Sequence, residues 1–211
     1  MQLGLDNSSI GYFVLSDNDK VIDLCKVPQP LNMYKEEIKI INKEIKELEP
    51  FLCIKGQKGK TEEKIKILKR RIISLNDSDP KDISRVLEWL TKYKESITIC
   101  YIEGLIYQTN DASSVKSFMK LAEYFGICQT CLDIVGIKYK VIPIQEWRKH
   151  YDYKETPKKL SSSDRKKFVK SESIRISGEL IKDIDKFWIP KGCRVINDNI
   201  CESSLLANLK L

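Results

Sequence analysis

Acidic residues stand at the ends of apolar segments at three widely separated places in the chain. Asp6 ends the opening apolar run, and Glu103 ends a second one near the middle. Asp198 and Glu202 lie four residues apart at the start of a third, close to the C-terminus. Gathered together, such carboxylates would bind Mg²⁺ or Mn²⁺, and a pair of these ions activates water and stabilises a leaving 3′ oxygen. The residue types therefore predict two-metal hydrolysis of phosphodiesters.

Each of these acids also has a structural interpretation. Asp6 can begin a turn between two strands, and Glu103 can be an ordinary strand end. Asn199 and Glu202 fit a capping box, in which the glutamate satisfies the first turn of a helix. The occurrence of all three acidic sites in one chain, each at the end of an element, favours the metal site over three separate structural roles.

The elements that would carry these acids can be read from the apolar pattern. Short apolar runs at 3–5, 11–15 and 21–27, joined by short links, predict three antiparallel strands. Apolar runs at 97–102 and 139–142, separated by a long helical pattern that starts near residue 112, predict a parallel βαβ unit. The fold class is therefore α/β, with a mixed five-stranded sheet and flanking helices.

This sheet would bring the acids together. Asp6 and Glu103 end the first and fourth strands, which are natural neighbours in such a sheet, so both acids are expected at one end of it. The last helix is predicted to run from about Asp198 toward Leu209. Asp198 and Glu202 are four residues apart, so they share one face of that helix and can point at the same spot.

Residues 33–76 differ in character from the rest of the chain. Apolar residues recur there at alternating spacings of three and four on both sides of 56–60, which predicts an antiparallel helical hairpin with a coiled-coil-like seam. We therefore predict a single nuclease domain over 1–211 with this hairpin inserted. A further helix is predicted from Asp79, as N-cap, to about Lys94.

The hairpin has two interpretations. In one it is a solvated packing element, and in the other it is an arm that contacts a second copy of the chain or DNA. Lysines lie at its tip: Lys55, Lys58 and Lys60.

The formal net charge of +7 suits a polyanion such as nucleic acid. The segment 147–175 is rich in basic residues interleaved with aromatic ones, and it follows the last predicted strand. It is either the place where a phosphate backbone lies or a solvated lysine-rich loop and helix. The candidate DNA-binding residues are Arg148, Lys149, Lys158, Lys159, Arg165, Lys166 and Lys167.

The cysteines indicate a reducing compartment. There are seven, an odd number, and most lie inside apolar runs, so we expect reduced thiols and a cytoplasmic protein of a bacterium or of a cell that hosts a phage or virus. Cys128 and Cys131 have the spacing of half a zinc site or a redox pair, but the one histidine, His150, offers no second half, which favours core packing. No apolar run reaches the roughly 18 residues of a membrane span, and no secretory signal is expected.

The residues resemble the RuvC-like branch of the ribonuclease H superfamily, the Holliday junction resolvases. The first motif of that family reads roughly LGIDPGxxxxGY, and residues 3–12 of this chain are similar to it. The second motif, an IEx strand end, is matched by residues 102–104, and the proline and aromatic that follow the fifth strand by Pro143 and Trp147. An acidic pair opens the last helix in both, although the pair is commonly three residues apart in the family and four here.

The resemblance implies an activity and its partners. Asp6, Glu103, Asp198 and Glu202 would be the catalytic metal ligands of a crossover junction endodeoxyribonuclease, with Mg²⁺ or Mn²⁺ as cofactor. The enzyme would act as a homodimer on branched DNA, nicking it symmetrically across a four-way junction, with no small-molecule substrate and no membrane partner. The alternative is a non-catalytic nucleic-acid-binding or scaffold module that uses the hairpin as an interaction arm.

Two other protein classes open with a similar strand and acid. The actin-like or sugar-kinase fold needs a second Gly-rich nucleotide loop, and an exonuclease of the DEDD type needs Asp-x-Glu in its first strand. The sequence contains neither feature.

Overall fold

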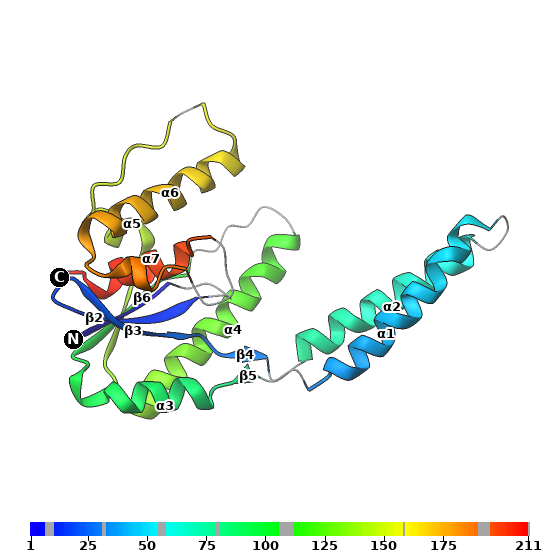
Figure 1. Cartoon of the computed structure of the whole chain (residues 1–211), viewed down its shortest axis with the longest axis horizontal. Coiled ribbons are helices and arrows are strands. Elements are labelled where there is room, and N and C mark those ends of the chain that lie inside the picture. The colour runs from blue at the N-terminus through cyan, green and yellow to red at the C-terminus, as the bar shows by residue number, and fades with distance from the viewer. Residues whose placement is uncertain are drawn as a thin grey trace. The chain divides into compact units, whose positions relative to one another are not determined.

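The computed structural model divides the chain into two compact units. One consists of Met1–Pro28 with Ile83–Leu211, and the other of Gln29–Asp82 (Figure 1). The described residues are 1–6, 11–30, 33–54, 58–78, 81–105, 112–157, 159–189 and 195–210. Several residues with predicted roles lie outside them: Lys55, Asp79 and Lys158.

A mixed five-stranded sheet, in the order β3-β2-β1-β6-β7, forms the centre of the first unit. Strands β1 (Gln2–Leu5), β2 (Tyr12–Asp17) and β3 (Lys20–Lys26) pair antiparallel. Strand β6 (Ile99–Glu103) pairs parallel with β1, and β7 (Tyr139–Ile142) pairs parallel with β6. The predicted α/β class and the neighbouring first and fourth strands are thus confirmed, in a sheet of ribonuclease H-like order.

Helices cover both faces of this sheet (Figure 1). Helices α3 (Ser84–Tyr93) and α4 (Ala112–Val135) share one hydrophobic core with the sheet. Helices α5 (Ile144–Arg148), α6 (Ser162–Leu180) and α7 (Asp198–Ala207) share the core on the other face. The first unit is therefore a three-layer α/β/α arrangement.

The alternation of side chains along β1 assigns its residues to these two cores. Leu3 and Leu5 are buried in the core under α3 and α4, so Gly4 between them faces α7. A Cβ atom at position 4 would overlap backbone atoms of Ser203 and Ala207. The glycine therefore allows α7 to lie directly against the strand that ends beside Asp6.

The second unit contains the predicted helical hairpin. Helix α1 (Lys35–Leu48) continues into a 3₁₀ turn at Glu49–Cys53 and is followed by helix α2 (Lys58–Ser78). Their shared core contains three buried isoleucines: Ile41, Ile45 and Ile65. Strands β4 (Gln29–Pro30) and β5 (Lys81–Asp82) pair antiparallel at the ends of the unit.

Two ion pairs join the helices across the seam of the hairpin. Arg71 contacts Glu37 at 2.6 Å, and Lys64 contacts Glu44 at 2.9 Å. From Glu37 to Glu44 along α1, the partner on α2 changes from Arg71 back to Lys64, as the antiparallel orientation requires. The ion pairs are exposed, so each contributes roughly 0–1 kcal/mol, and the buried isoleucines supply most of the stability of the hairpin.

The helix predicted from Asp79 is wrong at its start. Helix α3 begins at Ser84, because Lys81 and Asp82 are extended and pair with Pro30 and Gln29. The prediction considered only local capping signals, whereas a strand partner about 50 positions away in sequence determines this backbone. The predicted N-cap itself lies outside the described residues.

The described cysteines are free thiols. Cys128 and Cys131 are buried in the core under α4, which confirms the predicted packing role, and burial raises the pKa of both thiols. Among the described residues, no helix combines the length and the apolar character that crossing a lipid bilayer requires.

Candidate metal centre

Three of the four predicted acids converge at the carboxyl ends of β1 and β6. Leu5 pairs with Ile102 in the parallel ladder, so the next residues along the two strands, Asp6 and Glu103, are neighbours. Glu202 reaches the same place from α7, and Gly4 allows this helix to pack closely against β1. One ligand atom from each of the three acids lies within 4.8 Å of the others.

This cluster is largely shielded from water. Asp6 is 4% exposed and Glu202 is 7% exposed. The backbone N–H of Asp6 donates to Ser203 Oγ at 2.9 Å, which ties the end of β1 to α7. Burial, reinforced by the charge of the Glu202 carboxylate, raises the pKa of Glu103 to about 7, against the opposing effect of Arg148.

The donor set fits a hard divalent cation. Three carboxylates whose oxygens lie this close repel one another, and this repulsion adds to the desolvation that raises the pKa of Glu103. Mg²⁺ and Mn²⁺ prefer oxygen ligands and would neutralise the shared charge. Within the described part of the chain, Asp6, Glu103 and Glu202 therefore form a group that could hold such an ion.

Trp147 orients the first of the glutamates. The indole Nε1–H donates to Glu103 Oε2 at 3.0 Å, and the Trp147 side chain is fully buried. Tyr151 and Tyr153 pack edge-on against the indole, with ring centroids 6.3 and 6.0 Å away. Family resemblance pointed to this tryptophan, but its role as a hydrogen-bond donor to Glu103 is visible only in the structure.

Glu202 is held by residues of two other helices. Arg148 on α5 donates to Glu202 Oε1 at 2.9 Å, and Ser173 on α6 donates to the same oxygen at 2.7 Å. The Arg148 guanidinium also lies over the rings of Trp147 and Tyr153, at 5.1 and 5.5 Å from their centroids. One carboxylate oxygen of Glu202 is thus occupied by protein donors, and its orientation is determined from three helices.

The capping-box interpretation of Glu202 is wrong. The N-cap of α7 is Asn197, whose side chain accepts from the backbone N–H of Asn199 at 3.0 Å. Glu202 lies more than one turn into the helix, so its side chain is available to the cluster.

Asp198, the fourth predicted ligand, is not part of the three-carboxylate cluster. Its Oδ2 contacts Nζ of Lys170 on α6 at 2.6 Å. The hydrogen bond to Asp198 raises the pKa of Lys170, and the charges of Glu202 and Asp6 add to this effect. The Lys170 ammonium therefore lies in the field of the candidate metal centre, and sequence reasoning did not single it out.

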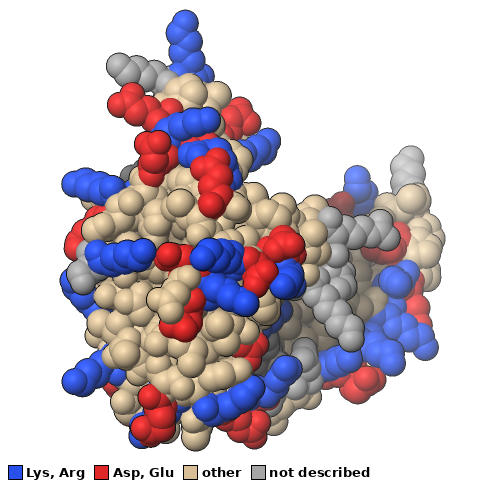
Figure 2. All heavy atoms as spheres, turned by 60° about the vertical axis from the view of Figure 1, so that its left-hand side comes forward, with Lys and Arg blue, Asp and Glu red and all other residues tan. Residues whose placement is uncertain are grey.

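The candidate DNA-binding residues differ in their surroundings. Arg148 is engaged with Glu202, as described above, and Lys167 pairs with Asp164 at 3.5 Å. The remaining described candidates are exposed side chains: Lys149, Lys159, Arg165 and Lys166. On the face shown in Figure 2, Lys and Arg are interspersed with Asp and Glu.

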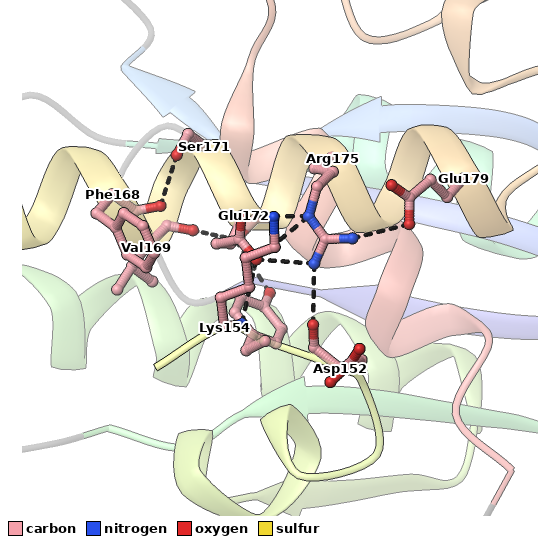
Figure 3. Close-up of polar contacts among 10 residues, drawn as sticks. Asp152, Lys154, Phe168, Val169, Ser171, Glu172, Arg175 and Glu179 are labelled. Atoms are coloured by element: carbon pink, nitrogen blue, oxygen red, sulfur yellow. Dashed lines mark hydrogen bonds and ion pairs between the residues drawn. The ribbon is translucent and has the colours of Figure 1, made fainter. Parts of the chain in front are cut away.

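Arg175, at the end of the predicted basic segment, has a structural role. It donates to Glu172 and Glu179 on its own helix and to the backbone carbonyl of Asp152 (Figure 3). Lys154 N–H donates to Glu172 from the same loop. These contacts fasten the loop after α5 to α6, which stabilises the side of the site that carries Tyr153.

The fold and the site together define an α/β protein with a ribonuclease H-like sheet and a carboxylate cluster at the ends of its two central strands. No protein-family model matches the sequence, and no curated protein matches it. Among solved structures, Thermus thermophilus RuvC in complex with a Holliday junction substrate matches with a TM-score of 0.46 and 10% identity, over 98% of this chain and 88% of that one. A second structure of Thermus thermophilus RuvC matches with a TM-score of 0.41 and 11% identity, over 98% and 90% of the two chains. With TM-scores below 0.5, the fold assignment depends on the sheet order itself.

Proposed function

We propose that this protein is a metal-dependent, structure-selective DNA endonuclease that resolves four-way junctions by paired nicks. One observation carries the proposal: Asp6, Glu103 and Glu202, from three distant parts of the chain, place ligand atoms within 4.8 Å of one another. Acids gathered in this way repel one another, and a bound divalent cation would remove that repulsion.

Asp6, Glu103 and Glu202 would hold Mg²⁺ or Mn²⁺, with Asp198 nearby as a further carboxylate for a second ion. Such ions activate water and stabilise the leaving oxygen of a phosphodiester. The chain itself supplies orientation: Trp147 and Arg148 hold the two glutamates through single hydrogen bonds. Outer residues of this kind commonly change metal affinity or activity by roughly 10–100-fold when removed.

The nucleic-acid substrate is supported by charge and by sequence resemblance. The exposed cations that follow the site along the chain, among them Lys149, Lys159, Arg165 and Lys166, suit phosphate contacts. The motifs around Asp6 and Glu103 resemble those of junction resolvases. Paired nicks need two centres on one junction, so we infer that two copies act together.

Cleavage of a synthetic four-way junction tests the proposal. Wild-type protein with Mg²⁺ or Mn²⁺ is expected to nick two opposed strands, and chelation of the ion should abolish the reaction. The variant Asp6→Asn should bind the junction without cutting it, because it loses one charged ligand. Asp133→Asn, which removes an exposed acid on α4, is the matched control and should cut like wild type.

Two results would count against the proposal. Cleavage that persists in a chelator, or full activity in Asp6→Asn, would exclude the metal mechanism. Junction binding by wild type without cleavage under any divalent metal would favour the non-catalytic scaffold.

A further inference from the structure

The ion pair between Lys170 and Asp198 separates one acid from the other three. Lys170 lies on α6 and Asp198 is the first residue of α7, and the two charged atoms are 2.6 Å apart. Glu202, one turn further along α7, points into the cluster with Asp6 and Glu103. Two acids on one helix face thus have different partners: a lysine for one and the carboxylate cluster for the other.

The position of Lys170 suits competition with a cation. Its ammonium group is held by Asp198 and also lies in the field of Glu202 and Asp6. A divalent ion that used Asp198 as a ligand would compete with this ammonium, because the ammonium holds Oδ2 and two cations beside one carboxylate repel each other. The two cations are therefore alternatives at Asp198.

Lys170 is also able to leave. Its side chain is 56% exposed, and a lysine has a flexible stem that can carry its charge several ångströms. A phosphate oxygen is a strong acceptor for an ammonium group. Lys167, one turn earlier on the same helix, pairs instead with Asp164 of α6, so the contact with α7 is a property of position 170.

We propose, building on the function proposed above, that Lys170 is a positioning residue that keeps Asp198 from the metal centre until a nucleic-acid phosphate draws its ammonium away. Asp198 is then released as a ligand, so the second ion is taken up when substrate is present. Without substrate the centre keeps the three-carboxylate cluster, and the nuclease is incomplete. In this way, binding of the second metal ion depends on binding of DNA.

Calorimetric titration with Ca²⁺ and Mn²⁺, without DNA, tests the competition and needs no activity. Wild type is expected to bind one ion well and a second weakly. Lys170→Met keeps most of the stem and removes the charge, so the second ion should bind at least about tenfold more tightly. Lys170→Arg keeps the charge and should resemble wild type, and Lys167→Met should do so as a matched control on α6.

The role of Asp198 is tested by combining variants. In Lys170→Met with Asp198→Asn, the gain in affinity for the second ion should disappear, because the ligand is gone. Thermal unfolding checks that each variant is folded, which is expected for exposed Lys170.

DNA provides the second arm of the test. A four-way junction added with Ca²⁺ should tighten binding of the second ion about tenfold in wild type and have little further effect in Lys170→Met. Unchanged binding of the second ion in Lys170→Met, with the first ion intact, would overturn this inference alone. Failure of wild type to bind any divalent ion would overturn the proposed function as well.

Discussion

Glu103 shows most clearly how the surroundings in the site disfavour a charged carboxylate. Its carboxylate is largely removed from water beside Glu202, and the charge of Arg148 and the indole of Trp147 oppose the rise in its pKa. A purely structural glutamate would be stabilised by its surroundings in the charged form. Glu103 is instead poised to accept a cation or a proton, as expected of a metal ligand without its metal.

The pKa of Glu103 predicts a pH-dependent stability in the metal-free protein. In the folded state this pKa of about 7 lies above the ordinary glutamate value of 4.5, so the folded state binds the extra proton between these pH values. The stability that this group contributes is therefore fully present below pH 4.5 and is lost as the pH rises through 7. The free energy of unfolding falls by on the order of 3 kcal/mol over this range. Glu103→Gln should remove this loss in chemical unfolding with EDTA at pH 5 and pH 8.

The control for this measurement is Asp133→Asn, which should follow the wild-type profile. Mg²⁺ should restore wild-type stability at pH 8 by binding the folded state, and it should have less effect on Glu103→Gln. Equal pH profiles of stability for wild type and Glu103→Gln would contradict the raised pKa of Glu103.

Trp147 gives a second prediction at the residue scale. Trp147→Phe keeps an aromatic ring but removes the N–H that donates to Glu103. We expect the protein to lose roughly 1–3 kcal/mol of stability and about 10–100-fold in junction cleavage, because Glu103 loses its orientation. Denaturant unfolding and single-turnover cleavage measure the two effects, and unchanged cleavage would show that the indole does not position the site.

At the scale of elements, the approach of α7 to β1 is what assembles the cluster. The strand ladder brings Asp6 beside Glu103, but Glu202 comes from a helix nearly 200 residues away from Asp6 in sequence. Gly4 permits this approach, and the hydrogen bond from Asp6 N–H to Ser203 secures it.

Gly4→Ala should therefore damage both fold and site. The added Cβ meets backbone atoms, which cannot rotate away, so α7 must shift or the protein must unfold. We expect a loss of at least about 3 kcal/mol, as for severe overpacking, together with loss of junction cleavage. Thermal unfolding and cleavage assays measure the two losses.

Gly126→Ala is the matched control. Outside its own turn of α4, no described atom lies within 4 Å of a Cβ at this position, and alanine favours a helix over glycine by roughly 1 kcal/mol. The control should be equally or more stable than wild type. Similar behaviour of the two alanine variants would mean that α7 does not depend on the glycine.

At the scale of the whole molecule, the chain forms two units with separate hydrophobic cores. The core of the hairpin contains Ile41, Ile45 and Ile65, and the carboxylates belong to the other unit. Elements with separate cores can unfold separately.

Ile45→Asp should therefore melt the hairpin and leave the unit that contains the carboxylates folded. A buried charge without a partner would destabilise the small hairpin core by more than that core can tolerate. Hydrogen exchange should show loss of protection over residues 35–78 and retained protection in β1 and β6. Lys43→Asp, on the exposed side of α1, is the control and should retain protection in both units.

Local sequence patterns predicted much of this protein. The strands that end at Asp6 and Glu103, the long helix between β6 and β7 and the helical hairpin all follow from the period of apolar residues. These elements depend on neighbours within a few positions, and the parallel connection through α4 then makes β6 and β7 adjacent. The start of α3 was missed because a distant strand, and not a local cap, determines the backbone at Lys81 and Asp82.

By itself, the sequence therefore determined most of the elements, the adjacency of the first and fourth strands and the candidate acids at the strand ends. Only the tertiary structure decided which acids meet. It placed Glu202 in the cluster and paired Asp198 with Lys170, although both acids lie on one helix. The physical reason is that side-chain partners depend on which helices pack across the sheet, and neighbouring α6 presents Lys170 to one acid and Ser173 to the other.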